Sequence, residues 1–189
     1  MRYIKWLFVL IFVSFSATTL LSQGFEEPSA GKAVVYFVKV TNYGGSTSFE
    51  YFHNDKYIGI FKKKNYLRYE CDPGEQLFWA SSENKEFLTA DLKEGGTYIV
   101  ITDVIMGFWK AHVGLTPIDE NDKETFERAK ELINSKPPIV MDESKIKKMN
   151  QKLKKFIKKE LEFYEEEAKF KHNFKHISAD MAIPVDLLQ

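Results

Sequence analysis

Hydrophobic residues in the central part of the chain fall in eight short runs that are typical of β-strands. Several alternate with the two-residue period of a strand, whereas residues 33–40 are nearly continuously apolar, which predicts a strand buried on both faces. Residues typical of turns separate the runs, which favours an antiparallel sandwich or small barrel. Two of the turns carry strong local signals. Asn54-Asp55 gives the two-residue spacing of a tight hairpin. In Pro73-Gly74, proline presets φ at about −65° and glycine can take the positive φ that a type II turn requires. The eight predicted strands span residues 33–40, 47–53, 56–62, 66–71, 76–81, 86–92, 97–104 and 108–115.

After Pro117 the hydrophobic period becomes that of a helix. It predicts a short helix within residues 119–135, followed by Pro137-Pro138, and prolines end helices because they cannot donate a backbone hydrogen bond. A long charged helix is predicted over residues 142–172, and residues 173–189 form a tail without a clear period. The apolar stripe of the long helix consists of Ile146, Met149, Leu153, Phe156, Ile157, Leu161, Tyr164 and Ala168.

The hydrophobic pattern therefore predicts a mainly β chain. We expect an antiparallel β-sandwich of about eight strands over residues 31–118, followed by a two-helix C-terminal extension.

The first 23 residues have the order of a secretory signal peptide. Arg2 and Lys5 precede an apolar run over residues 6–15, and small and polar residues follow. The run is shorter than the roughly 20 residues of a spanning helix; an uncleaved anchor is the alternative. We expect export to the periplasm, the envelope or the outside of the cell. The mature chain would begin between Thr19 and Phe25, with residues 24–30 as a flexible polar lead-in.

Charge and cysteine content narrow the function classes. The chain has 27 Lys plus Arg and 27 Asp plus Glu, whereas nucleic-acid binding needs a clustered cationic excess, so nucleic acid is not an expected partner. Cys71 is the only cysteine, which excludes an intramolecular disulfide and a cysteine-based zinc site. It shares a strand face with Leu67 and Tyr69, which predicts a small buried hydrophobic side chain.

The histidines do not form a pattern typical of a metal site or a catalytic centre. His172 and His176 are four residues apart and Asp180 follows, but a metal site needs a third ligand and an anchored helix, and the helix is predicted to end here. His53 and His112 are predicted to lie on the surface of the sheet.

Asp103 is unusual because it alternates with Ile99 and Ile101 in an apolar strand. It is either a paired, buried carboxylate or the end of a strand that faces water. No serine lies in a nucleophile elbow and no glycine-rich loop fits a phosphate. We therefore predict no enzyme activity, no catalytic residue, no metal and no cofactor, although folding could still bring carboxylates together.

Four aromatic residues lie in or beside the predicted strands as adjacent pairs: Phe78 with Trp79, and Phe108 with Trp109. Aromatic residues at strand positions mostly belong to the core. If they are exposed instead, Trp79, Trp109 and Phe108 are the candidate binding residues, as a platform for sugar rings.

The long helix has its charges in an order that its macrodipole opposes. Lysines fill the first half and glutamates fill the second, and these are Lys145, Lys147, Lys148, Lys152, Lys154, Lys155, Lys158, Lys159, Glu160, Glu162, Glu165, Glu166 and Glu167. This is either a solvated face or a surface that pairs with opposite charge. Because an antiparallel copy would set each basic half against an acidic half, we predict antiparallel pairing with a second molecule or an oppositely charged helix. Docking of the helix back on the sandwich is the competing outcome.

The run DKYIGIFKKKNYLRYECDPGEQLFWAS resembles a family of secreted bacterial domains of unknown function, and also resembles the PEGA-type surface β-sandwiches. The resemblance rests on Asn54-Asp55, Gly59 and Pro73-Gly74-Glu75 and covers about residues 31–118. A histidine commonly follows the last turn, where this chain has Gln76. These motifs are turn chemistry, so the resemblance implies an accessory domain of the envelope or the cell exterior and carries over no catalytic residues.

These observations favour a non-enzymatic structural or binding domain, exported or associated with the envelope, with an envelope protein or a glycan as partner. A carbohydrate- or peptidoglycan-binding module is the first alternative, and a small hydrolase is the second. Exposed aromatic rings beside polar groups would indicate the former, and carboxylates or histidines that meet in a cleft would indicate the latter.

Overall fold

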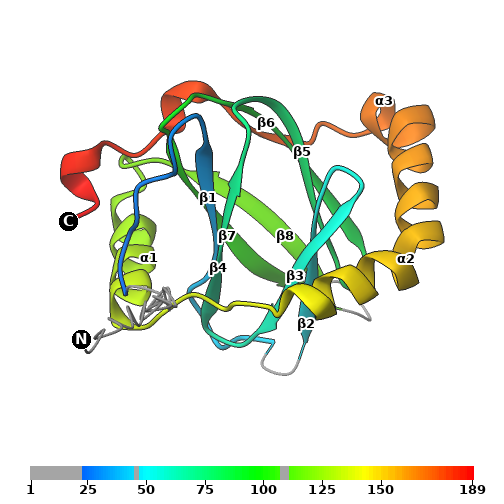
Figure 1. Ribbon diagram of the computed structural model, residues 1–189, viewed down its shortest axis with the longest axis horizontal. Helices are drawn as coiled ribbons and strands as arrows, with labels where there is room; N and C mark the ends of the chain where they lie inside the picture. Colours follow the sequence, from blue (N-terminus) through cyan, green and yellow to red (C-terminus); the bar gives the residue numbers. More distant parts are fainter. Residues whose placement is uncertain (1–22, 45–46, 107–110) are drawn as a thin grey trace, which may run out of the picture.

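The computed structural model describes residues 23–44, 47–106 and 111–189. In this part of the chain nine strands form two sheets (Figure 1). The first sheet has the strand order β4-β1-β7-β8, with β1 at Ala33–Lys39, β4 at Asn65–Cys71, β7 at Thr97–Met106 and β8 at Ala111–Ile118. The second has the order β3-β2-β5-β6-β9, with β2 at Ser48–His53, β3 at Lys56–Lys62, β5 at Gly74–Ser81, β6 at Lys85–Leu92 and β9 at Lys175–Ile177.

An apolar core lies between the two sheets. Alternate residues of β1, namely Ala33, Val35 and Phe37, belong to this core together with Tyr51 and Phe78 from the second sheet. The intervening residues of β1 belong to a different core on the outer face of the first sheet. Both faces of β1 are therefore buried, which explains why its sequence is apolar without alternation.

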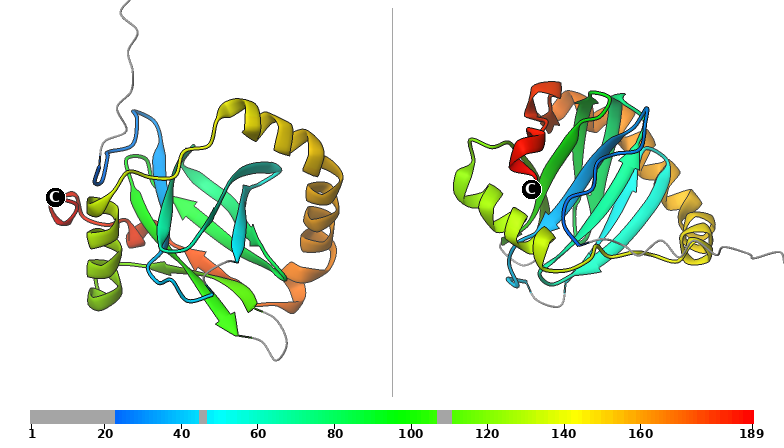
Figure 2. Two further views of the ribbon diagram at one scale, coloured as in Figure 1. Left: turned by 90° about the horizontal axis from the view of Figure 1, so that it is seen from below. Right: turned by 60° about the vertical axis from the view of Figure 1, so that its left-hand side comes forward.

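Helices cover the outer faces of both sheets, which gives four layers in the order helix, sheet, sheet, helix (Figure 2). α1 at Lys123–Ser135 packs on the first sheet. α2 at Glu143–Phe163 packs on the second, and the chain continues as a π-helical segment at Tyr164–Ala168 and as α3 at Lys169–Lys171. Among the described residues, no helix has both the length and the apolar character that crossing a membrane would require.

The structure confirms a mainly β chain with two sheets and helices, and it differs from our expectation in detail. β1 pairs with β7 in parallel and β6 pairs with β9 in parallel, so the sandwich-like arrangement is not wholly antiparallel. The additional strand, β9, comes from the segment that we expected to be an irregular tail. The helices form the outer layers of the fold instead of an extension from it, and α3 adds a third.

The two predicted turns have the backbone conformations that their residues indicate. Asn54 has a φ of +48°, and the β2–β3 hairpin closes with His53 opposite Lys56, as expected. Gly74 has a φ of +93°, where a residue with a Cβ is strained. The Pro-Gly turn does not close a hairpin, however, because β4 belongs to the first sheet and β5 to the second. It is a corner between the sheets.

Asparagine side chains satisfy the backbone at two edge strands. On β3, the amide nitrogen of Tyr57 donates to Oδ1 of Asn150 (2.8 Å), and Nδ2 of Asn150 donates to the Tyr57 carbonyl (3.0 Å). On β8, Asn84 makes the same pair of bonds with Val113 (2.7 and 2.9 Å). Each carboxamide thus substitutes for a neighbouring strand, which blocks the edge against pairing with another chain.

The C-terminal segment crosses from the second sheet to the first. After β9 come two short 3₁₀ helices at Ala179–Met181 and Val185–Leu187. Between them the amide of Ile183 donates to the carbonyl of Thr97, and further on the Lys130 ammonium of α1 donates to the carbonyl of Leu187. These bonds hold the end of the chain against the first sheet and α1.

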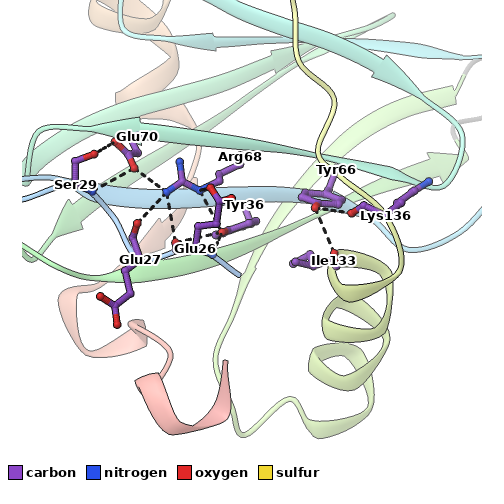
Figure 3. A network of polar contacts seen from close by, with 9 residues as sticks. All are labelled: Glu26, Glu27, Ser29, Tyr36, Tyr66, Arg68, Glu70, Ile133 and Lys136. Atoms are coloured by element: carbon purple, nitrogen blue, oxygen red, sulfur yellow. Dashed lines mark hydrogen bonds and ion pairs between the residues drawn. The ribbon is translucent and has the colours of Figure 1, made fainter. Parts of the chain in front are cut away.

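The lead-in before β1 is held by a polar network on the first sheet (Figure 3). The Arg68 guanidinium donates to the carbonyl of Glu27 (3.1 Å) and to the carboxylate of Glu70 (2.7 Å), and the amide of Glu26 donates to the Tyr36 hydroxyl (2.9 Å). Burial alone would raise the pKa of Glu70, but the bonds from Arg68 and Ser29 lower it overall. The lead-in is therefore fixed, in contrast to the flexibility that its polar sequence predicts.

Candidate functional site

The structure places Trp79 in the interior, beneath α2. Its side chain is 1% exposed, and its ring stacks on Phe52 with 3.7 Å between the ring centroids. Phe156 of α2 also contacts it, and the indole nitrogen donates to the carbonyl of Asn54. Trp79 thus presents no ring face to a sugar. Phe108 and Trp109, the other candidates for an aromatic platform, lie outside the described residues.

A hollow of about 870 Å³ lies between α2 and the tip of the β2–β3 hairpin. Asp55 and Lys56 line it on the hairpin side. On the helix side the lining residues recur every three or four positions, so they lie on one face. Ile157 and Leu161 are apolar, and the other side chains on this face are charged or carry an amide. The lining residues from α2 are Lys147, Asn150, Gln151, Lys154, Ile157, Lys158, Leu161 and Glu162, and those from the π-helical segment after it are Glu165 and Glu166.

A second hollow of about 790 Å³ continues from the first one across the outer face of the second sheet. Asp55, Leu161 and Glu165 line both hollows, so the two meet at these residues. The second hollow is the more polar, with lining that includes Asn54, Glu75, Gln76, Thr89, Asp91 and His176. We call the two hollows together the α2 groove.

The wall of the α2 groove is fixed by the apolar stripe of α2. The stripe residues predicted from the sequence pack on the second sheet, around Phe52, Trp79 and Phe87. Asn150 ties the same helix to β3 through the bonds to Tyr57. The helix thus docks back on the sheets. We had named this docking as the alternative to antiparallel pairing with a second molecule. Its solvated lysines and glutamates remain on the surface.

Charge changes sign along the helical wall of the groove. Lys147, Lys154 and Lys158 come first along the chain, and the acidic side chains of Glu162, Glu165 and Glu166 follow. An ion pair between Lys158 and Glu162 (3.5 Å) crosses this boundary, and a second pair, between Glu165 and Lys169, lies on its acidic side. In the described part of the chain, Lys147 and Lys154 take part in no ion pair. The basic end of the groove therefore offers two uncompensated ammonium groups.

A cluster of hydrogen-bonded side chains lies beside the second hollow. His53 of β2 contacts the Tyr69 hydroxyl through Nδ1 (3.0 Å) and Oε1 of Gln76 through Nε2 (2.7 Å), and its ring stacks on Phe78. Gln76 in turn donates through its Nε2 to the carbonyl of Asp72 (3.0 Å). His53 is half-buried and bonded at both nitrogens, and is not the sheet-surface histidine that we expected.

The bonding partners place a proton on Nε2 of His53. The oxygen of Gln76 can only accept, so Nε2 donates to it, with Nδ2 of Asn54 also 3.2 Å away, while the Tyr69 hydroxyl can donate to Nδ1 when the ring is neutral. Burial lowers the pKa of His53, which Gln76 partly opposes, and burial raises the pKa of Tyr69 to about 12. Both groups are thus held neutral near pH 7. This arrangement links the two sheets and lends rigidity to one end of the groove.

Cys71 is buried, as predicted, and burial raises the pKa of its thiol to about 11. A thiol with this pKa is protonated near pH 7 and is not an activated nucleophile.

Asp103 lies between the two states that we considered. It is half-buried, which raises the pKa of its carboxyl, while Lys175, Lys39 and Arg128 oppose the shift without making an ion pair in the described structure.

The C-terminal histidines do not share a helix face. α3 ends at Lys171, His172 has an extended backbone, and His176 lies in β9, where its Nδ1 is 2.9 Å from the Thr89 hydroxyl. The described residues contain no group of three or more histidine, cysteine or acidic side chains that could hold a metal ion.

Sequence reasoning found the charged helix but missed the groove beside it. Lys147, Gln151, Lys154, Lys158 and Glu162 recur every three or four residues, which marks a second stripe next to the apolar one. The sequence could have identified that stripe as one wall of a binding site. It could not have identified the opposing residues on the β2–β3 hairpin, because only the docking of α2 across the second sheet brings them close to the stripe.

A comparison with protein-family models found no match for this chain, and a comparison with curated protein sequences found no significant match. The resemblance of residues 31–118 to secreted bacterial domains and PEGA-type sandwiches therefore stays a prediction, and the function has to be argued from the geometry.

Proposed function

We propose that this protein is an exported, envelope-associated binding domain without enzyme activity, and that the α2 groove is its binding site. The observation that carries the proposal is the groove itself: two joined hollows of a size that suits a small ligand or a short polymer segment. Their walls are a helix docked by its whole apolar stripe and a tight hairpin. Such a site is formed before a ligand arrives, which lowers the free-energy cost of binding.

The first described residues, Gln23 and Gly24, are held at the end of α1. Gln23 donates to the carbonyl of Asn134 at the end of α1, and Gly24 donates to that of Ile133. α1 and α2 lie on opposite sides of the two sheets (Figure 1). The groove therefore lies on the opposite side of the two sheets from Gln23 and Gly24, and their attachment to α1 leaves it open.

The titratable groups around the groove support binding over catalysis. His53 is bonded to neutral groups on both nitrogens, and Cys71 belongs to the core between the sheets. In the second hollow the Thr89 hydroxyl lies 2.9 Å from Nδ1 of His176, but among the described residues no third group bonds to the other nitrogen of this imidazole to orient it as a base.

A carbohydrate- or peptidoglycan-binding module remains the second candidate function. The lining of the second hollow favours it, because the carboxamides of Asn54 and Gln76 and the carboxylate of Asp91 can bond to sugar hydroxyls.

A matched pair of tryptophan substitutions tests the proposed site. Asp55 is an exposed residue that lines both hollows, and Asp55→Trp would obstruct the groove; Glu94 is exposed in the β6–β7 turn, and Glu94→Trp is the control. The wild type and both variants are screened against an array of glycans and peptidoglycan fragments and against a displayed peptide library. We expect ligands that bind the wild type and the Glu94 variant but not the Asp55 variant. The proposal fails if obstruction of the groove leaves the binding of every ligand unchanged.

A further inference from the structure

The residues of the α2 groove also indicate the chemical class of its ligand. Ile157 and Leu161 are apolar and lie at the middle of the helical wall, between the lysine end and the glutamate end. A ligand that matches all three parts has acidic groups, an apolar centre and basic groups in this order. Among polymers in the cell envelope, peptides combine these three kinds of group in one short chain.

The distances along the wall fit an extended peptide. Lys154 and Glu165 are separated by eleven helical positions, or roughly 16 Å at 1.5 Å per residue. An extended chain covers this length in about five residues at roughly 3.3 Å each. From this geometry, and on the basis of the proposed function, we infer that the α2 groove binds an extended peptide whose acidic and basic residues are grouped at opposite ends of a short apolar segment.

A second copy of this chain fits the groove less well than a peptide does, although its charges would match in the antiparallel sense. Figure 2 shows that α2 curves around the β2–β3 hairpin. The lining residues lie on α2 and on the tip of this hairpin, which places the groove on the inner side of the curve. The same surface of a second copy is equally concave, so two such surfaces cannot fill each other. The apolar stripe that would drive self-association is already packed on the second sheet.

The test uses two acetylated and amidated nonapeptides of the same composition. The block peptide has three acidic residues, Ala-Leu-Ala and three basic residues, and the control peptide has the same central triplet with alternating charges. Each is titrated into ¹⁵N-labelled protein, and amide chemical shifts report both the affinity and the site. We expect the block peptide to shift residues of the groove and to bind about 2- to 30-fold tighter than the control, as two exposed ion pairs would give. This advantage should shrink at 0.5 M salt.

Two double variants separate recognition in the groove from general attraction. Lys147 and Lys154 line the groove, whereas Lys148 and Lys155 have the same spacing and exposure outside it. The K147E/K154E variant should bind the block peptide about 2- to 30-fold more weakly, and K148E/K155E should bind it as the wild type does. Equal losses in both variants would show that only the net charge matters and would overturn the inference.

The other outcomes are equally decisive. Equal affinity for the two peptides, or shifts outside the groove, would refute a charge-ordered peptide site. If an oligomer of N-acetylglucosamine or a peptidoglycan fragment shifts the groove residues and the peptides do not, the peptide inference fails and the proposed binding site stands. If none of these probes reaches the groove, both fail. Sedimentation that shows a dimer which K147E/K154E abolishes would make a second copy the occupant and would also overturn the inference.

Discussion

Asn150 offers a sharp test of how α2 is attached, because its contacts and its helix propensity predict opposite effects. Asparagine is a poorer helix former than alanine, so propensity alone predicts that Asn150→Ala stabilises the protein by about 0.5 kcal/mol. The substitution also removes the two bonds to the backbone of Tyr57 and a third to the carbonyl of Ile146. Tyr57 is 1% exposed, so its amide and carbonyl would lose their partners inside the protein.

The structure sets the size of the effect. A buried polar group without a partner costs about 1–3 kcal/mol, and two such groups together cost about 2–6 kcal/mol. Asn150 lines the groove, so water can partly replace it, and the lower end of this range applies. After the gain in propensity we expect a net loss of about 1.5 kcal/mol in the free energy of unfolding. For a chain of this size that lowers Tm by about 3–6 °C.

Thermal unfolding followed by circular dichroism, with denaturant titration to obtain the free energy, measures this loss. Gln151→Ala is the control, because Gln151 is the next residue, is exposed and lines the same groove; its effect should stay within about 0.5 kcal/mol. Asn150→Asp keeps the acceptor for the Tyr57 amide but sets a carboxylate against the Tyr57 carbonyl. Its deficit should diminish at acidic pH, where the carboxyl group can donate. A melting temperature for Asn150→Ala equal to that of the Gln151 control would refute the reasoning.

Three further predictions concern the other polar and buried groups. The Cys71 thiol should react with a thiol reagent only after unfolding, because it is buried and its pKa is raised to about 11, and rapid labelling of the native protein would contradict this. Arg68→Leu should release the lead-in and lower the free energy of unfolding by about 1–3 kcal/mol, seen as faster amide hydrogen exchange at residues 25–29; unchanged exchange would show that the network does not hold the lead-in. Burial lowers the pKa of His53 below its unfolded value of about 6.5, so the unfolded state binds more protons and stability should fall as the pH decreases below about 6.5. His53→Gln should remove this part of the pH dependence, and an identical dependence in the variant would mean that His53 titrates normally in the folded protein.

Local signals predicted the strands and turns well, since the physical causes lie within a few residues. Asn54-Asp55 closes a hairpin and Gly74 takes a positive φ, because both outcomes depend on the conformations that these residues allow. What the Pro-Gly turn connects was not predictable in this way. Whether β4 and β5 pair or separate into two sheets depends on their partners, β1 and β2, which lie more than twenty residues away.

The parallel pairings and β9 escaped prediction for the same reason. β1 and β7 are brought together by their shared apolar character across some sixty residues of sequence. β9 is three residues long, and its sequence, Lys-His-Ile, carries no strand period. It forms because β6 offers a free edge and because the chain leaving α3 passes beside it, which no local pattern encodes.

The attachment of α2 to the second sheet bears on why its charges can follow this order. The lysine-to-glutamate order along α2 runs against the macrodipole. The terminal turns, where a charge matters by about 0.3–1 kcal/mol, nevertheless carry favourable charges, with Glu143 in the first turn and Lys169 and Lys171 in α3, where the continuous helix ends. The helix tolerates this order because its stripe, from Ile146 to Ala168, is packed on the second sheet and Asn150 fixes it to β3. Stability is thus provided by one side of the helix, and the charges on the other side are free to differ from what stability favours. A charge order that the packing of the helix does not require is what a surface for recognition would show. The groove lies along that surface, and its two ends carry the opposite charges.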